Sequence, residues 1–148
     1  MIEKGLLQLV TTDSGVSALI PKDVGGTPQV YWLLAPKGAK APYIILSRVT
    51  TKDTYDMVGD TDLREGLFQV DCYTDSTSGV SGGYYACRAI ADAVRDLLKN
   101  FRGALPDTDA TKVQATFLDK DWDMPYQEGA KGFTFRVMLH FRVHFIDA

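Results

Sequence analysis

The sequence predicts an α+β fold: a mainly antiparallel sheet of four to five strands with two main helices packed on one face. Residues 132–146 alternate apolar and polar side chains, the period of a β-strand. Residues Cys87 to Phe101 place apolar side chains at i, i+3, i+4 and i+7, the spacing of an amphipathic helix. The patterns along the chain follow the order helix, strand, two strands, helix, two strands. The Cys87–Phe101 helix is therefore expected to cover the apolar face of the last strand.

The first half of the chain begins with a short helix over Ile2–Thr12, and one more helical turn is predicted over Val16–Ile20. Strands are predicted from the apolar runs that follow: Val30–Leu34, Tyr43–Thr51 and Leu67–Tyr73. The polar stretch Asp53–Glu65, around Gly59, is too long for a tight turn. We expect it to form a loop at the end of a long hairpin arm.

The second half begins with a turn rich in Ser and Gly, followed by the Cys87–Phe101 helix. Lys112–Asp119 is predicted as the fourth strand, and Asp119–Gly132 as an acidic loop that contains aromatic residues. The last strand would be unusually long. At about 3.3 Å per residue it would extend roughly 40 Å, as far as the expected width of the domain. Its odd positions are assigned to the core and its even positions to a polar, basic face.

The length of 148 residues corresponds to a single domain spanning residues 1–148. A net charge of −3 argues against sequence-independent nucleic-acid binding. No apolar run approaches the about 20 residues of a membrane span, and no leader pattern is present, so we expect assembly in the cytoplasm. Cys72 and Cys87 are then expected to be reduced, buried thiols.

One motif has the spacing of a hydrolase nucleophile. Gly79–Gly83 reads G-x-S-x-G with Ser81 at its centre. Several residues separate Ser81 from the preceding strand, whereas a nucleophile elbow begins where its strand ends. The only histidines, His140 and His144, lie within a strand pattern and not on a loop. A flexible turn is the favoured interpretation, and no catalytic residue is assigned.

No metal or cofactor site is predicted either. On a strand, His140 and His144 would lie roughly 13 Å apart, too far to share one metal ion. Asp119, Asp121 and Asp123 imitate the start of an EF-hand loop. That loop requires Gly at its sixth position and Glu at its twelfth, where this chain has Met124 and Ala130. The sequence therefore favours a protein that acts through its surface.

Three segments are candidates for that surface, because exposed aromatic and Met residues are enriched at interface centres. The alternative for each is an ordinary solvated loop or polar sheet face. The candidates are, on the arm, Tyr55, Met57, Asp60 and Asp62; on the acidic loop, Asp119, Asp121, Trp122, Asp123 and Tyr126; and on the last strand, Arg136, His140 and Arg142.

Four stretches resemble the tail-terminator, or tail-completion, proteins of long-tailed bacteriophages and gene transfer agents. They read LLQLVTTDSGVSALI; APYIILSRV; LFQVDCYTDS leading into ACRAIADAVRDLLKNFRG; and FLDKDWDMPYQEGAKGFTFRVMLHFRVHF. They cover nearly the whole chain in the family's order. The segment PKDVGGTPQVYW and the Gly-rich turn before the Cys87–Phe101 helix depart from the family's pattern.

The resemblance implies a non-enzymatic virion protein without cofactors. Such proteins form a ring, usually a hexamer, at the head-proximal end of the tail tube, where they stop tube polymerisation and join the head connector. The implied partners are further copies of the chain, the tube protein and the connector or stopper protein, with no membrane and no nucleic-acid specificity. The implied location is the neck of the virion. Two alternatives remain: another neck component such as a head-closure protein, and a small serine hydrolase that uses Ser81.

Overall fold

The described residues of the protein form one six-stranded sheet with three helices. The computed structural model describes residues 1–76, 83–129 and 132–146. The sheet has the order β1-β2-β3-β6-β5-β4, in which only the β1–β2 pair is parallel. The elements are α1 (Ile2–Thr12), α2 (Ser14–Ser17), β1 (Val30–Trp32), β2 (Tyr43–Tyr55), β3 (Asp60–Asp75), α3 (Gly83–Leu98), β4 (Gly103–Ala104), β5 (Lys112–Gly129) and β6 (Gly132–Ile146). The α+β class and the mainly antiparallel sheet are confirmed, whereas the count of four to five strands is wrong because it missed β4.

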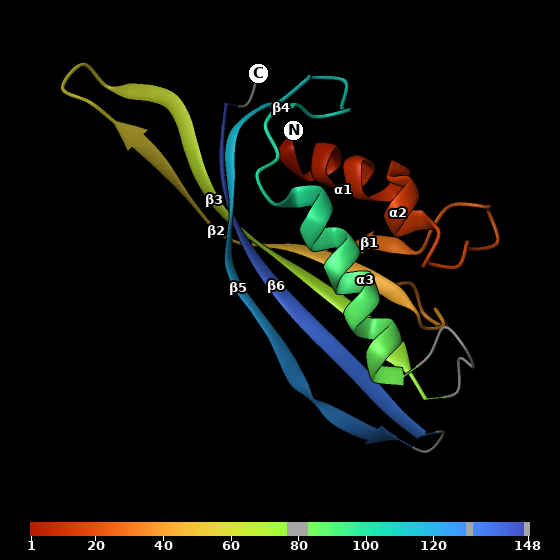
Figure 1. Ribbon diagram of the computed structural model, residues 1–148. Helices are drawn as coiled ribbons and strands as arrows, with labels where there is room; N and C mark the ends of the chain where they lie inside the picture. The colour runs from red at the N-terminus through yellow and green to blue at the C-terminus, as the bar shows by residue number, and fades with distance from the viewer. Residues whose placement is uncertain (77–82, 130–131, 147–148) are drawn as a thin grey trace.

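Strand β6 lies at the centre of the sheet although it is the last element of the chain. It pairs with β3 from Leu63↔Ile146 to Asp75↔Thr134, and with β5 along its other side. The strand predicted over residues 132–146 is therefore confirmed with its bounds. Figure 1 shows the long strands curving around the helices, which lie on one side of the sheet.

Two of the three helices, α2 and α3, begin at identifiable signals. Helix α1 has the predicted bounds. The next helical turn is α2, which starts earlier than expected because Asp13 caps it: the Val16 amide donates to Asp13 Oδ2 at 3.0 Å. Helix α3 begins at Gly83, whose φ of 82° lies in the left-handed region that favours glycine. Within the described ranges, no helix is long and apolar enough to span a bilayer.

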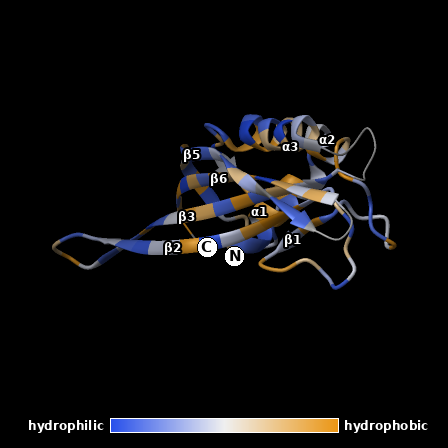
Figure 2. Ribbon diagram, turned by 90° about the horizontal axis from the view of Figure 1, so that it is seen from below, coloured by the Kyte–Doolittle hydropathy of each residue, from blue (hydrophilic) through white to orange (hydrophobic). Residues whose placement is uncertain are grey.

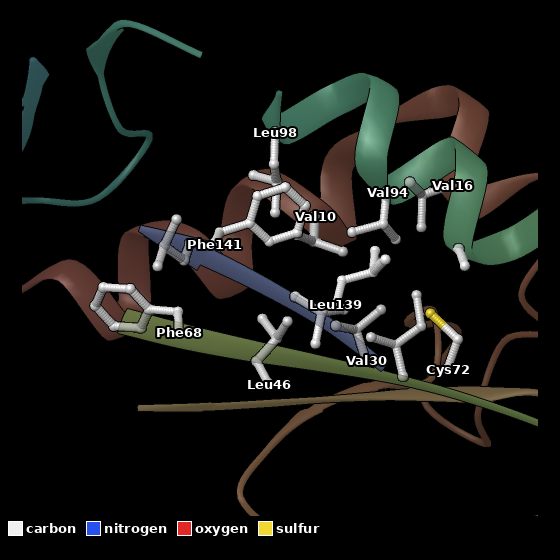
Figure 3. Close-up of a cluster of buried hydrophobic side chains, with 14 of the residues drawn as sticks. Val10, Val16, Val30, Leu46, Phe68, Cys72, Val94, Leu98, Leu139 and Phe141 are labelled. Atoms are coloured by element: carbon white, nitrogen blue, oxygen red, sulfur yellow. The ribbon is translucent and has the colours of Figure 1, made fainter. Parts of the chain in front are cut away.

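The core lies between the helices and the sheet face formed by the odd positions of β6 (Figure 3). Val137, Leu139, Phe141, Val143 and Phe145 are each at most 1% exposed. Helix α3 contributes Cys87, Ile90, Ala91, Val94 and Leu98, and helix α1 contributes Ile2, Leu6 and Val10. The expectation that the second main helix covers this face is confirmed. Phe133, at the far end of β6, is 39% exposed and lies outside that core.

Polar and apolar residues alternate along the strands, as Figure 2 shows by colour. The predicted acidic loop over Asp119–Gly132 is nevertheless wrong, because β5 continues to Gly129 and stays paired with β6. The register shifts between Leu118 and Lys120 and between Met124 and Gln127, but the pairing resumes after each irregularity. The first strand is shorter than predicted: β1 ends at Trp32, and Leu33 and Leu34 are 65% and 79% exposed.

Candidate interaction surfaces

The first candidate surface is the β-hairpin arm, which we define as residues Asp53–Arg64. It is a β-hairpin and not a loop, because β2 and β3 remain paired from Asp53↔Arg64 to Tyr55↔Asp60, with one register shift between Asp53 and Tyr55. Strand β6 supports β3 only up to Leu63. The rest of the arm is a two-stranded ribbon that projects beyond the sheet (Figures 1 and 2).

Local polar contacts hold the arm in shape. At the turn, Asp56 Oδ1 accepts hydrogen bonds from the amides of Val58 at 2.7 Å and Gly59 at 3.0 Å. Gly59 has a φ of 141°, which a residue with a Cβ rarely adopts. At the base, Arg64 Nε donates to Asp53 Oδ1 at 2.8 Å. The arm is therefore pre-shaped although a third strand supports only its base.

The tip of the arm is apolar. Tyr55, Met57 and Val58 are 68%, 105% and 97% exposed. The candidates Tyr55 and Met57 thus lie together at an exposed tip, and Val58 joins them. Sequence reasoning missed Val58, although its position next to Met57 in a turn was the available signal. The other two candidates of the arm, Asp60 and Asp62, lie on its return strand, where the Asp62 amide donates to Asp60 Oδ1 at 2.9 Å.

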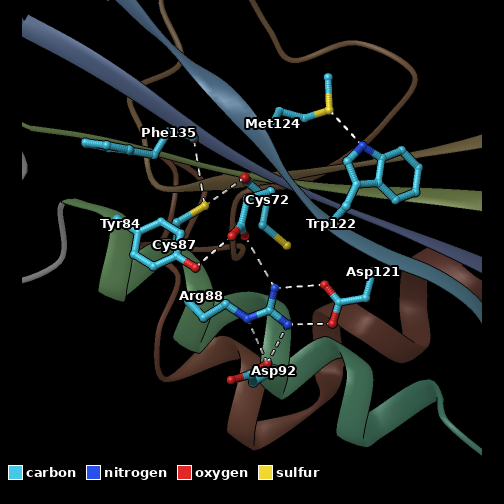
Figure 4. A network of polar contacts seen from close by, with 10 residues as sticks. Cys72, Tyr84, Cys87, Arg88, Asp92, Asp121, Trp122, Met124 and Phe135 are labelled. Carbon is cyan, nitrogen blue, oxygen red and sulfur yellow. Dashed lines mark hydrogen bonds and ion pairs between the residues drawn. The ribbon is translucent and has the colours of Figure 1, made fainter.

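Strand β5 turns two of its acidic residues toward α3, where Arg88 binds them (Figure 4). Arg88 donates from Nη1 to Asp121 Oδ1 at 2.8 Å and from Nη2 to Asp121 Oδ2 at 2.5 Å, a bidentate pair. It also contacts Asp92 at 3.0 Å and Asp123 at 3.5 Å. The Tyr84 hydroxyl donates to Asp123 Oδ2 at 2.8 Å. Asp121 and Asp123 therefore bind helix α3 of their own chain.

These contacts shift the pKa of the groups involved. Hydrogen bonding to Asp121 raises the pKa of Arg88 above its usual value, against the opposing effect of burial, so Arg88 is a permanent cation. The hydrogen bond to Asp123 raises the pKa of Tyr84. Beside this cluster, the Cys87 thiol donates to the carbonyl oxygen of Cys72 at 3.0 Å. Both cysteines are buried and free, as predicted, and burial raises the pKa of each thiol.

The second candidate surface is the sheet face opposite the helices, which we call the uncovered face. It carries an ordered polar network. Arg136 pairs with Asp71, at 3.0 Å from Nη2 and 3.1 Å from Nε, and Asp71 is only 4% exposed. Asp71 also accepts from Gln69 Nε2 at 2.7 Å. Because the Gln69 amide group uses its NH2 in this way, its Oε1 accepts from His140 Nε2 at 2.9 Å.

Aromatic rings continue this network across the strands. Trp122 packs edge-on against His140 with ring centroids 4.8 Å apart, and Phe117 packs similarly against His144 at 5.8 Å. Burial, together with the charge of Lys120, lowers the pKa of His140, so its imidazole is neutral at neutral pH. Arg142 bridges Glu65 at 3.2 Å and Asp119 at 3.3 Å. The candidates Asp119, Trp122, Arg136, His140 and Arg142 are thus brought together on one face.

The remaining sequence-based assignments are placed as follows. The backbone of Tyr126 belongs to β5, but its side chain lies outside the described part of the structure. Ser81 and most of the G-x-S-x-G segment also lie outside the described residues. His140 and His144 contact different aromatic rings, on Trp122 and Phe117. Among the residues that are described, no three His, Cys, Asp or Glu side chains are grouped to hold a metal ion.

Comparison with known proteins gives a consistent picture. The family model described as tail completion protein gp17 matches residues 4–145. A solved structure titled "Virion of native gene transfer agent (GTA) particle" contains a chain with the same fold. Its TM-score is 0.70 at 21% identity, over 97% of this chain and 93% of that one. A second solved structure gives a TM-score of 0.50 at 17% identity, over 95% of this chain and 94% of its own. The search of curated proteins found no significant match.

Proposed function

Because this chain belongs to the tail completion protein gp17 family, whose members are structural proteins of bacteriophage virions, we propose that it closes the tail. In this proposal several copies, six by analogy with such proteins, form a ring at the head-proximal end of the tail tube. The ring prevents further tube protein from adding and presents the surface to which the head connector binds. Assembly takes place in the host cytoplasm, and the finished ring remains in the neck of the virion.

The observation that carries the proposal is the family match over residues 4–145, which includes the arm and both faces of the sheet. A similar fold in the gene transfer agent particle supports a place in a virion. The mechanism needs no catalysis. A cap acts by binding the last tube ring through one surface while its other surface does not resemble a tube end, so that no further ring is added.

The arm is our candidate for the contact with tube or connector. Its tip exposes three large apolar side chains on a ribbon whose shape is already fixed, so little conformational entropy is lost on binding. The uncovered face, with Trp122, Arg136, His140 and Arg142 held by intramolecular contacts, is our candidate for packing against a neighbour. Rigid aromatic and Arg groups of this kind are typical of interface centres.

The proposal is tested by adding the purified protein to tubes assembled from the tail tube protein and imaging them by negative-stain electron microscopy. We expect rings at one end of each tube, and tubes that stop growing when more tube protein is added. The double substitution Met57→Asp and Val58→Asp should abolish capping with little change in thermal stability, because both side chains are fully exposed. Val24→Asp, at an equally exposed residue in the loop before β1, is the matched control and should leave capping intact.

Tubes that continue to grow in the presence of the wild-type protein would refute the capping function. Binding to isolated head connectors without any effect on tubes would indicate a head-closure protein instead. Capping that survives the double substitution would refute the role of the arm but not the capping function. Ester hydrolysis that disappears in a Ser81→Ala variant would instead favour the hydrolase.

A further inference from the structure

The long strands β2 and β5 lie next to the short outer strands β1 and β4 and are unpaired along most of their outer sides. Strand β1 pairs with β2 only at Ile44–Leu46. Strand β4 pairs with β5 only at residues 112–113. In the described part of the chain, no strand covers the outer side of β2 from Arg48 to Tyr55 or of β5 from Phe117 to Glu128. We call these segments the β2 edge and the β5 edge.

The register identifies which backbone groups point outward. The Leu46 carbonyl accepts from the Leu33 amide at 2.8 Å, so the backbone N–H and C=O groups of Leu46 point away from β3. The Thr116 carbonyl accepts from the Asn100 amide at 3.3 Å, so the backbone groups of Thr116 point away from β6. Antiparallel strands alternate these directions, and each edge contains one bulge near its start. The next residues whose backbone N–H and C=O groups point outward are Arg48, Thr51 and Asp53 on the β2 edge. On the β5 edge they are Leu118, Asp121 and Asp123.

An exposed strand edge is a template for pairing with another chain. We propose that the β2 edge of one copy pairs with the β5 edge of the next copy, so that main-chain hydrogen bonds join the subunits of the ring. This proposal rests on the proposed function, because it names the contact that holds the ring together. Since β2, β3, β6 and β5 run alternately up and down, the β5 edge of a neighbour continues the antiparallel order beyond β2.

The two edges also differ in charge, and ion pairs within the chain offset part of that difference: Arg88 binds Asp121 and Asp123, Arg142 binds Asp119, and Glu3 binds Arg48. The β2 edge has two basic residues, Arg48 and Lys52, against one acidic residue, Asp53. The β5 edge has four acidic residues, Asp119, Asp121, Asp123 and Glu128, against one basic residue, Lys120. Two β5 edges would place like charges opposite each other, which is unfavourable. Contacts between unlike edges are head-to-tail, and they close into a ring when the rotation allows it.

Both edges also carry exposed apolar side chains. Val49 and Tyr55 on the β2 edge are 49% and 68% exposed, and Phe117 on the β5 edge is 53% exposed. The bulges and Pro125 limit pairing with arbitrary strands, because they break the regular pattern that aggregation requires. The edges therefore combine an apolar contact with selectivity for one partner.

The open segments of the two edges lie toward opposite ends of the sheet. Within one copy Arg48 lies level with Leu118, since both align with the Phe68–Phe141 pair. Strands β1 and β4 cover opposite ends of the two edges, so the open parts meet only if the next copy shifts along the strands by about six residues, roughly 20 Å. Over a subunit about four strand spacings wide, roughly 19 Å, this shift corresponds to strands tilted by about 45°. Closed barrels tilt their strands by about 35–45°, so the shift is compatible with a ring. Because each sheet curls around its own helices, we expect a scalloped ring and not a smooth barrel.

Hydrogen exchange read by mass spectrometry tests the contact directly, because an amide that gains a main-chain hydrogen bond exchanges more slowly. We expect outward-pointing amides of both edges to exchange at least about tenfold more slowly in rings than in monomers. The solvent-facing side of α3 serves as the internal control. Rings in which both edges exchange as fast as in monomers would overturn the edge pairing while leaving the proposed function intact. A protein that forms no ring, alone or on tube ends, would refute both.

A pair of variants gives an independent test at one position. Thr51→Pro removes an amide that points outward, at an edge where proline is tolerated. Thr51→Ala keeps that amide. The variant loses no side-chain hydrogen bond, because the Thr51 hydroxyl has no partner among the described residues. We expect rings from Thr51→Ala and folded monomers from Thr51→Pro, with folding checked by circular dichroism. Rings of normal stability from Thr51→Pro would contradict the proposal. If that variant does not fold, exchange in the wild-type protein decides.

Discussion

Gly66 lies where the arm leaves the sheet, and the structure leaves no room there for a side chain. A Cβ at this position would lie 2.4 Å from Phe68 Cε2, 2.9 Å from Phe68 Cζ and 3.2 Å from Phe145 Cε1. Ordinary contact begins at 3.4 Å, so the Phe68 ring would have to move by about 1 Å. Both rings are buried, Phe68 at 3% exposure and Phe145 fully, and the apolar cavity beside Phe68 has a volume of only about 20 Å³.

We therefore expect Gly66→Ala to lower the free energy of unfolding by about 2–3 kcal/mol, in the upper part of the range for overpacked cores. For a chain of this length, that corresponds to a fall in Tm of about 4–12 °C. The measurement is urea unfolding followed by circular dichroism, with thermal unfolding as a second readout. Gly25→Ala is the matched control, because a Cβ there would meet only Asp23 Oδ1, at 3.4 Å, in an exposed loop.

A second variant identifies the cause. In Gly66→Ala/Phe68→Leu the smaller side chain vacates the space that the new methyl group needs. The double variant should therefore lose at least about 1 kcal/mol less than the sum of the two single variants. A Gly66→Ala protein within about 0.5 kcal/mol of the wild type, or strictly additive losses in the double variant, would refute this reasoning.

Three further predictions concern the polar clusters and the core. Arg88→Met should cost about 1–2 kcal/mol in urea unfolding, because Asp121 loses a bidentate partner, and Arg88→Lys should cost less. Because the pKa of His140 is lowered on folding, the unfolded chain takes up the proton first, so stability should fall as the pH drops below about 6.5. His140→Gln should flatten that pH dependence. Leu139→Ala, at a fully buried residue, should cost about 2–5 kcal/mol.

The parts of the fold that the sequence predicted are those in which a single periodicity extends over many residues. Helix α1 and strand β6 have their predicted bounds because each carries an uninterrupted pattern. The pattern of β6 also predicted its core face. The class and the helix-covered sheet followed from that face together with the stripe on α3.

The strand predicted over Lys112–Asp119 is the first part of β5, but its continuation to Gly129 was missed for a reason that no local pattern contains. Its helix-facing positions include Asp121 and Asp123, which a strand does not usually turn toward a core. They are accommodated because Arg88, far away in the sequence, reaches them from α3. Sequence reasoning placed Arg88 only beside Asp92, its neighbour one turn along the helix. In the sequence alone, the acidic residues of β5 therefore indicate a solvated loop.

The candidate surfaces could be predicted in type but not in arrangement. Tyr55 and Met57 stood out as apolar residues in a polar stretch, and they lie at an exposed tip. The joining of Trp122 and His140 on one face depends on the register between β5 and β6, which includes three irregularities. A shift of one residue would have turned one of them to the opposite face.

The central position of β6 has a consequence for how the chain reaches its native state. Strands β3 and β5 both pair with β6, which the ribosome makes after them. Until it emerges, each leaves its inner edge open beside apolar side chains, a state that favours misassembly. The β3–β6 pair also joins residues distant in sequence, for example Gln69 and His140, and pairings of this kind form slowly. We therefore expect the sheet to form late and in one step, after synthesis of β6, so that the nascent chain depends on chaperones more than its modest length suggests.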